Sequence, residues 1–293
     1  MSLRGAIVRF LDHPGGRFIL AKAASASAQR ITRSDVQIAY HQGQWTRRIG
    51  ASVESVGPNF AYTREVFRSW RDRIEAYAAE TRDYWLRFYE PKEGDTIIDV
   101  GAGQGEDALT FSRLVGKTGR IIAIEAHPLS FKALKKFCQL NELSNVTPVH
   151  LALMDKPGEV RIIESESWME NRVTSNGEPG SSMAAPAGTL DDLCRKLGIR
   201  EISFLKMNIE GAERYALPGA EKTMPHIRHI CVACHDFRAD QGHGEEFRTR
   251  SFAERILANE GFAIEDRADD PRDYIRDQIW GRRSSKRNPE RDE

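Results

Sequence analysis

The stretch Thr96-Ile-Ile-Asp-Val-Gly-Ala-Gly-Gln-Gly-Glu-Asp107 decides the fold of this 293-residue chain. Its first five residues form a short β-rich apolar run, which is typical of a buried strand. Glycine then alternates with other residues from position 101 to position 105, and glycine lets a backbone turn sharply and approach a ligand closely. Residues 107–115 have the pattern of a helix. Strand, glycine turn and helix in this order predict a ligand site at the start of the helix.

The same alternation of strand and helix continues along the chain. Strands are predicted at residues 120–125, 146–151, 159–164, 202–209 and 229–235, and helices at 128–141, 189–197, 212–220 and 247–260. Two further segments, 262–265 and 274–280, are predicted as closing antiparallel strands. This order predicts an α/β protein with a Rossmann-like, doubly wound, mostly parallel seven-stranded sheet.

Three sections of the chain are predicted. Residues 1–90 are interpreted as an α-helical N-terminal extension, with helices at 3–12, 17–30 and 62–90. Residues 91–280 form the α/β domain, and the polar residues 281–293 are predicted to be a disordered tail. Within the domain, residues 165–188 are rich in Ser, Glu, Asn, Gly and Pro, and we predict a long loop that covers a site and carries Trp168 and Met169.

The bulk composition argues against several classes of partner. Lys plus Arg equals Asp plus Glu at 43 each, so no global charge favours nucleic acid, and we predict no nucleic-acid partner. No apolar run approaches the ~20 residues of a membrane span. We therefore expect a cytoplasmic location without a transmembrane segment; a homo-oligomer is compatible with the sequence.

The cysteines do not indicate a disulfide framework or a metal site. Four cysteines in a chain of this length are too few for a secreted disulfide scaffold. Cys231 and Cys234 have CxxC spacing, but they fall on a predicted strand, where residues three apart point to opposite faces. This placement argues against a redox pair or joint metal binding.

The details of the glycine turn indicate which cofactor it serves. Position 106 carries Glu where the dinucleotide pattern GxGxxG requires glycine. Glu106 and Asp107 at the helix start would repel a pyrophosphate, and they suit a ligand with a cationic amino-acid portion. Glu125 ends the next strand, 20 residues after Gly105, where an acid commonly bonds ribose hydroxyls. These features favour S-adenosylmethionine (SAM) over NAD, and an NAD-dependent oxidoreductase is kept as the alternative.

Five stretches of the sequence resemble the class I SAM-dependent methyltransferases, and more closely the FkbM type. They are Gly94–Gly103, Ile121–Pro128, Asn145–Leu153, Gly188–Asp192 and Leu205–Glu213. The resemblance covers about residues 90–280 and implies methyl transfer from SAM. In this family the acceptor is usually a hydroxyl oxygen of a small molecule or sugar, as in natural-product or glycan biosynthesis. The family usually has Asp where this chain has Asn208, which removes a charge and keeps a non-catalytic SAM-binding protein as a further alternative.

The predicted cofactor-binding residues come from the glycine turn and the ends of the next strands. They are Asp99, Gly101, Gly103, Gly105, Glu106, Glu125, Ala126 and Leu153. The resemblance implies that Asp99 lies behind the glycine turn near the methionine portion, and that the region from Leu153 to Asp155 lies near the adenine.

The predicted catalytic residues are Asn208, Glu210 and His235, at the carboxyl ends of two later strands. Methyl transfer needs proximity and orientation, and an alcohol acceptor also benefits from a base that takes its proton. His235 has the pKa best suited to that role, and Glu210 is the second candidate. We predict no metal site; a divalent cation held by Glu210, His235 and Asp236 is an alternative that no ligand spacing demands.

Overall fold

The computed structural model describes residues 7–8, 10–41, 43–49, 52–57, 60, 76–163, 172–174 and 182–283. The chain divides into two compact units. One comprises Met1–Glu80 with Lys136–Leu143, and the other comprises Thr81–Lys135 with Ser144–Glu293. Trp168 and Met169 lie outside the described residues. In the part of the chain that the structure describes, no helix is both long and apolar enough to cross a membrane.

The first unit contains a helix and a small antiparallel sheet. Helix α2 (Arg17–Thr32) is followed by strands β1 (Val36–His41), β2 (Gln44–Ile49) and β3 (Ser52–Gly57), in the sheet order β1-β2-β3. Small and apolar side chains at every fourth position of α2 pack with Val36, Ile38 and the fully buried Trp45. The helix predicted at residues 17–30 is confirmed, but the α-helical description of this section was incomplete, because it missed these three strands.

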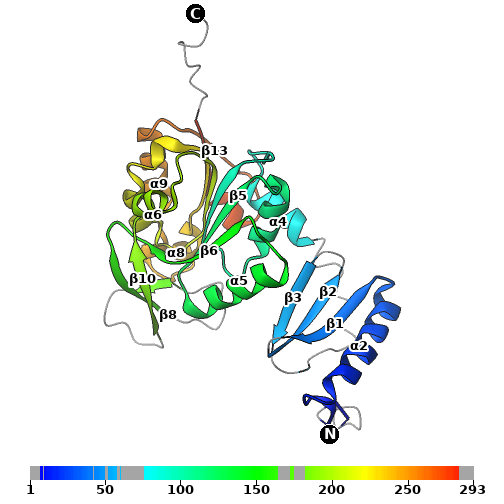
Figure 1. Cartoon of the computed structure of the whole chain (residues 1–293). Helices are drawn as coiled ribbons and strands as arrows, with labels where there is room; N and C mark the ends of the chain where they lie inside the picture. Colours follow the sequence, from blue (N-terminus) through cyan, green and yellow to red (C-terminus); the bar gives the residue numbers. More distant parts are fainter. Residues whose placement is uncertain are drawn as a thin grey trace, which may run out of the picture. The chain divides into compact units, whose positions relative to one another are not determined.

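The second unit is built around a seven-stranded sheet with the order β13-β14-β12-β11-β4-β5-β6 (Figure 1). Its strands are β4 (Thr96–Val100), β5 (Arg120–Glu125), β6 (Val146–His150), β11 (Ile202–Met207), β12 (Ile227–Ala233), β13 (Ala263–Asp266) and β14 (Gln278–Arg282). Strand β14 is antiparallel to its neighbours β12 and β13, and the pairs among β12, β11, β4, β5 and β6 are parallel. The predicted Rossmann-like, mostly parallel sheet is confirmed.

Helices cover both faces of this sheet, as the doubly wound prediction requires. Figure 1 shows α4 on one side and α6 and α9 on the other. The helices of the unit are α4 (Glu106–Val115), α5 (Pro128–Leu140), α6 (Leu190–Leu197), α7 (Glu213–Ala216), α8 (Asp236–Asp240), α9 (Arg250–Asn259) and α10 (Asp273–Arg276), with short 3₁₀ turns at Pro218–Ala220, Met224–His226 and Glu245–Phe247. Of the helix predicted at 62–90, residues 76–85 are helical and residues 86–90 are not, and residues 62–75 lie outside the described part.

The region predicted as a loop contributes instead to a second sheet. Strands β7 (Ala152–Leu153), β8 (Gly158–Ile163), β9 (Arg172–Thr174) and β10 (Ser182–Gly188) form a four-stranded sheet in the order β7-β10-β8-β9. The strand predicted at 159–164 is therefore present, but it pairs with β10 outside the main sheet. Polar and small residues hid β10, because the strand has few apolar side chains to bury.

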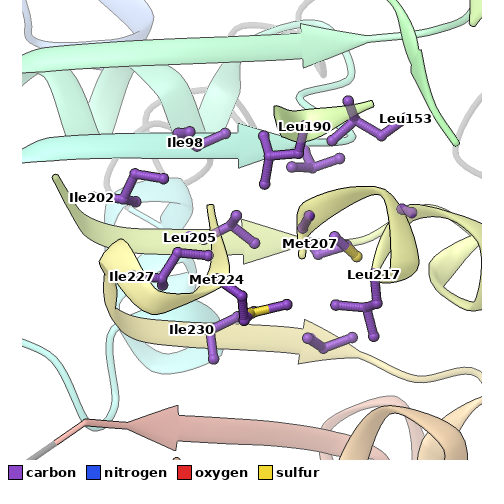
Figure 2. Packing of buried hydrophobic residues seen from close by; sticks show 14 of the residues in the cluster. Ile98, Leu153, Leu190, Ile202, Leu205, Met207, Leu217, Met224, Ile227 and Ile230 are labelled. Atoms are coloured by element: carbon purple, nitrogen blue, oxygen red, sulfur yellow. The ribbon is translucent and has the colours of Figure 1, made fainter. Parts of the chain in front are cut away.

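One apolar cluster of the second unit lies on the α6 side of the main sheet. Figure 2 shows side chains of β4, β11 and β12 packed together with Leu190 of α6 and with Leu217, which follows α7. Ile98, Leu205 and Ile230 are each no more than 1% exposed. Burial of these side chains stabilises the parallel strands whose carboxyl ends carry the candidate site.

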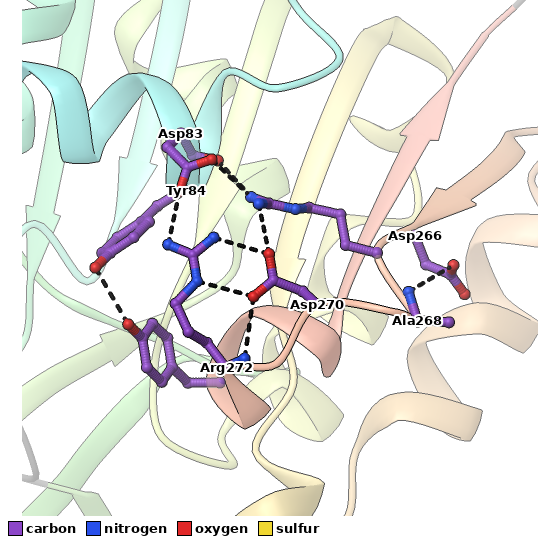
Figure 3. A network of polar contacts seen from close by, with 8 residues as sticks. Asp83, Tyr84, Asp266, Ala268, Asp270 and Arg272 are labelled. Atoms are coloured by element: carbon purple, nitrogen blue, oxygen red, sulfur yellow. Dashed lines mark hydrogen bonds and ion pairs between the residues drawn. The ribbon is translucent and has the colours of Figure 1, made fainter.

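A network of ion pairs ties the helix of residues 76–85 to the segment that follows β13 (Figure 3). Asp83 receives hydrogen bonds from Arg267 at 3.0 Å and from Arg272 at 2.7 Å. Asp270 accepts two hydrogen bonds from the Arg272 guanidinium, each 2.8 Å long. Planar guanidinium–carboxylate pairs have a fixed geometry, so this network orients the helix against the closing strands.

Helix α6 has a side-chain N-cap that can be tested directly. The Thr189 Oγ1 accepts a hydrogen bond from the Asp192 backbone nitrogen at 3.0 Å, which satisfies one of the free amides of the first turn. We expect Thr189→Ala to lower the free energy of unfolding by about 1 kcal/mol. Thr189→Ser keeps the hydroxyl and is the control; equal melting temperatures for both variants would contradict the assignment.

Candidate active site

The strand order reverses between β4 and β11, and the predicted site lies there. β5 and β6 continue from β4 in one direction, whereas β11 and β12 continue in the other. Val100 of β4 and Val232 of β12 are both in register with Met207 of β11, so the three strands end together. In open α/β sheets, ligands bind outside the carboxyl ends of the strands at such a reversal.

Gly101 and Asn208 meet at this point. A Cβ atom on Gly101 would lie 1.9 Å from the backbone oxygen of Asn208, and the φ of Gly101 is +79°. Only glycine fits both the contact and the backbone conformation. The Oδ1 atom of Asn208 is buried and has no hydrogen-bond partner among the described residues. A buried acceptor of this kind fits a hydrogen-bond donor of a ligand.

The glycine turn continues with positive φ angles at Gly103 (+55°) and Gly105 (+106°). Gly105 precedes the first residue of α4, Glu106, which lies one position before the predicted helix start at 107. Asp107 accepts a 2.7 Å hydrogen bond from the Thr81 hydroxyl. Asp107 therefore belongs to a hydrogen-bonded network inside the unit.

Glu125 closes the turn from the next strand. Its Oε2 atom accepts a hydrogen bond from the Gly103 nitrogen, and its Oε1 atom accepts one from the His127 nitrogen, both at 2.8 Å. Burial raises the pKa of Glu125, and these two backbone hydrogen bonds act against that rise. A carboxylate at the end of β5 fits the hydroxyls of a nucleoside, which is the role predicted for it.

The other predicted cofactor residues occupy different environments. The Asp99 side chain is fully buried, and its Oδ1 atom lies 2.8 Å from the Lys206 Nζ atom. The Ala126 carbonyl oxygen lies 3.0 Å from the His150 Nε2 atom. Leu153 is buried in the core on β7. The contacts predicted for these three residues with SAM stay predictions.

A buried charged cluster lies at the ends of β11 and β12. The His235 Nε2 atom lies 3.1 Å from Glu210 Oε1, and its Nδ1 atom lies 3.6 Å from Glu213 Oε1. Arg238 donates a 2.6 Å hydrogen bond to the other oxygen of Glu210. Thus the structure brings together His235 and Glu210, which were both predicted as catalytic, and adds Glu213 and Arg238.

The charges of this cluster shift its pKa values. Burial lowers the pKa of His235, but the Glu210 carboxylate and then that of Glu213 outweigh burial, so the pKa lies above its ordinary 6.5. Burial raises the pKa of Glu210, but His235 and Arg238 outweigh it in turn and hold that pKa below its ordinary range. Glu210 also has φ of +53°, which is strained for a residue other than glycine. Strain of this kind is concentrated at functional sites.

Asp236, which the metal alternative requires, points elsewhere. Its Oδ1 atom accepts hydrogen bonds from the backbone nitrogens of Thr249 (2.8 Å) and Arg250 (2.9 Å). Across the described ranges, no three His, Cys, Asp or Glu side chains are grouped to hold a metal ion. The carboxylate of Asp236 instead orders the start of α9.

Comparison with known proteins identifies the domain. The family model described as the methyltransferase FkbM domain matches residues 99–264, which is more than half of the chain. The chain belongs to the FkbM methyltransferase family. The FkbM domain is a SAM-dependent methyltransferase domain, and SAM is the cofactor of this family. This confirms the family, cofactor and fold predicted from the glycine turn and from Leu205–Glu213.

The individual relatives match only a short stretch of this chain or have a low sequence identity to it. A 60-residue stretch of the FkbM protein is 35% identical to the protein-L-isoaspartate O-methyltransferase of Fervidobacterium nodosum, and covers 20% of this chain and 30% of that protein. The FkbM methyltransferase of Methylobacillus flagellatus is 14% identical, with a TM-score of 0.43, over 74% of this chain and 60% of that one. Fibrillarin from Aeropyrum pernix, crystallised with natively bound SAM, is 14% identical, with a TM-score of 0.44, over 84% and 97%.

The prediction missed three charged residues of the candidate site. Lys206 and Glu213 lie within the resemblance, but a lone charge on a strand or a helix start is typical of a solvent-exposed residue. Both are buried here. Arg238 follows His235 by three residues, which is the spacing of neighbours on one helix turn, so its position was the one signal available.

Proposed function

We propose that this chain methylates a hydroxyl oxygen of a small molecule or a sugar. The observation that carries the proposal is the pair of His235 and Glu210, 3.1 Å apart at the carboxyl ends of the strands beside the glycine turn. An alcohol must lose its proton as its oxygen takes the methyl group, and a histidine held by a carboxylate is suited to accept that proton. SAM supplies the methyl group on its sulfonium.

Each residue of the cluster has a separate part in this proposal. His235 accepts the hydroxyl proton on Nδ1, which lies 3.6 Å from Glu213 and has no hydrogen-bond partner among the described residues. Glu210 orients the imidazole and stabilises the cation that forms. Arg238 holds the second oxygen of Glu210, and Glu213, which also accepts a hydrogen bond from the Ile209 nitrogen at 3.1 Å, fixes the turn after β11. The acids around the glycine turn favour a cationic ligand there.

The test is methyl transfer from isotope-labelled SAM to a panel of hydroxylated sugars, polyketides and peptides. We expect label in at least one product as an O-methyl ether. Products methylated only on nitrogen or carbon would overturn the proposal. SAM binding without transfer to any acceptor of the panel would favour the non-catalytic alternative.

A further inference from the structure

The ammonium group of Lys206 contacts the glycine turn and the two elements that flank it, β4 and α4. Lys206 is 2% exposed. Its Nζ atom donates a 2.9 Å hydrogen bond to the carbonyl oxygen of Gly101, lies 2.8 Å from Asp99 Oδ1 and lies 3.7 Å from Asp107 Oδ2. One ammonium group therefore joins the end of β4, the turn itself and the first turn of α4.

The local backbone explains how Lys206 reaches this position. Lys206 and Asp99 are neighbours in the parallel register of β11 and β4, so their side chains lie side by side. The ring of Trp85, which belongs to the helix of residues 76–85, has its centroid 5.0 Å from the Lys206 Nζ atom. The same helix supplies Thr81, which holds Asp107. The flexible lysine stem is thus confined on several sides.

Carboxylates surround this ammonium group. Burial lowers the pKa of Lys206, but the attraction of Asp99, then of Asp107, and at longer range of Glu125 outweighs burial and raises it. Lys206 therefore keeps its charge. A buried charge of this kind is stable only with its partners in place, and removing one partner leaves the other uncompensated.

We propose that Lys206 is the positioning residue of the SAM-binding turn, and that Asp99 acts through Lys206 rather than by touching the cofactor. The Asp99 side chain is 0% exposed, and its Oδ1 atom faces the ammonium group at 2.8 Å, while its Oδ2 atom has no hydrogen-bond partner among the described residues. Gly101 packs against the Asn208 backbone too closely to allow a side chain, and the Lys206 hydrogen bond to its carbonyl oxygen holds the turn at this residue. The proposal concerns binding of the methyl donor and not the choice of acceptor, so its test is independent of whether the chain methylates a hydroxyl oxygen.

The test is a double-mutant cycle with SAM affinity measured by calorimetry. The variants are Asp99→Asn, Lys206→Met and the double variant. We expect each single variant to bind SAM about tenfold or more weakly, and the double variant to bind no more weakly than Lys206→Met, because the two residues act as one unit. Lys206→Arg should recover part of the affinity. Asp95→Asn is the control, because Asp95 precedes β4 at its opposite end, where it bonds Tyr89 and Lys92.

A second measurement uses the protein without SAM and does not depend on Lys206→Met folding. We expect faster amide hydrogen exchange at residues 101–105 in Asp99→Asn than in the parent protein, with unchanged exchange at residues 158–163. Additive losses of SAM affinity in the cycle would overturn the proposal and indicate direct contact by Asp99. Unchanged exchange at the turn in Asp99→Asn, or unchanged SAM affinity in a folded Lys206 variant, would overturn it as well.

Discussion

Gly101→Ala is expected to weaken SAM binding by at least about 100-fold. The added Cβ atom would lie 1.9 Å from the Asn208 backbone oxygen, and it would force a φ of +79° on a residue with a side chain. Backbone strain costs about 1–3 kcal/mol and overpacking adds about as much. Since every 1.4 kcal/mol is tenfold in affinity, the combined cost reaches about 100-fold even after partial relaxation.

Gly158→Ala is the matched control for this prediction. No atom lies within 4 Å of a Cβ built on Gly158, so this variant should bind SAM like the parent protein. Titration calorimetry measures both affinities, and thermal unfolding shows whether the Gly101 variant remains folded. If Gly101→Ala binds SAM within about threefold of Gly158→Ala, the turn does not hold the cofactor in the way that its contact with Asn208 implies.

The sequence could predict the main sheet because its strands are buried on both faces. Such strands are continuous apolar runs, and those at Thr96–Val100 and Arg120–Glu125 begin and end in the structure where they were predicted. The strands from Val36 to Gly57 could not be predicted in this way. Strand β1 alternates buried and exposed residues over only six positions, and β2 includes the adjacent charged residues Arg47 and Arg48.

The candidate site was predictable where a short motif carries the geometry. The turn needs positive φ angles at Gly101, Gly103 and Gly105, which glycine adopts readily, so these residues could be assigned from their spacing alone. The pairing of Lys206 with Asp99 could not, because it depends on which strands become neighbours. For the same reason the sequence placed His235 and Glu210 at strand ends but could not foresee that Glu213 would lie on the other side of the imidazole.

His235→Asn is expected to lower kcat by about 10²- to 10⁴-fold, the usual contribution of a general base. SAM affinity should change little, because His235 contacts the glutamates of its own cluster and not the glycine turn. His229→Asn is the matched control. His229 lies on the same strand, β12, far from its carboxyl end, and its ring hydrogen-bonds the Ser203 carbonyl oxygen. Initial rates with saturating SAM measure both variants; equal rates would remove His235 from the mechanism.

The pH dependence of kcat separates His235 from Glu210 as the base. A base works in its unprotonated form, and the pKa of His235 is raised, so the imidazole holds its proton above pH 6.5 and the rate should increase with pH over a range above that value. Glu210→Gln removes the strongest attraction for that proton, so the same increase should move to lower pH. If Glu210 were the base, its lowered pKa would give a rate that is constant across neutral pH and is lost in Glu210→Gln. The pH profile therefore shows which residue is the base before the natural substrate is known. Any hydroxyl substrate found in the panel reports the same titration.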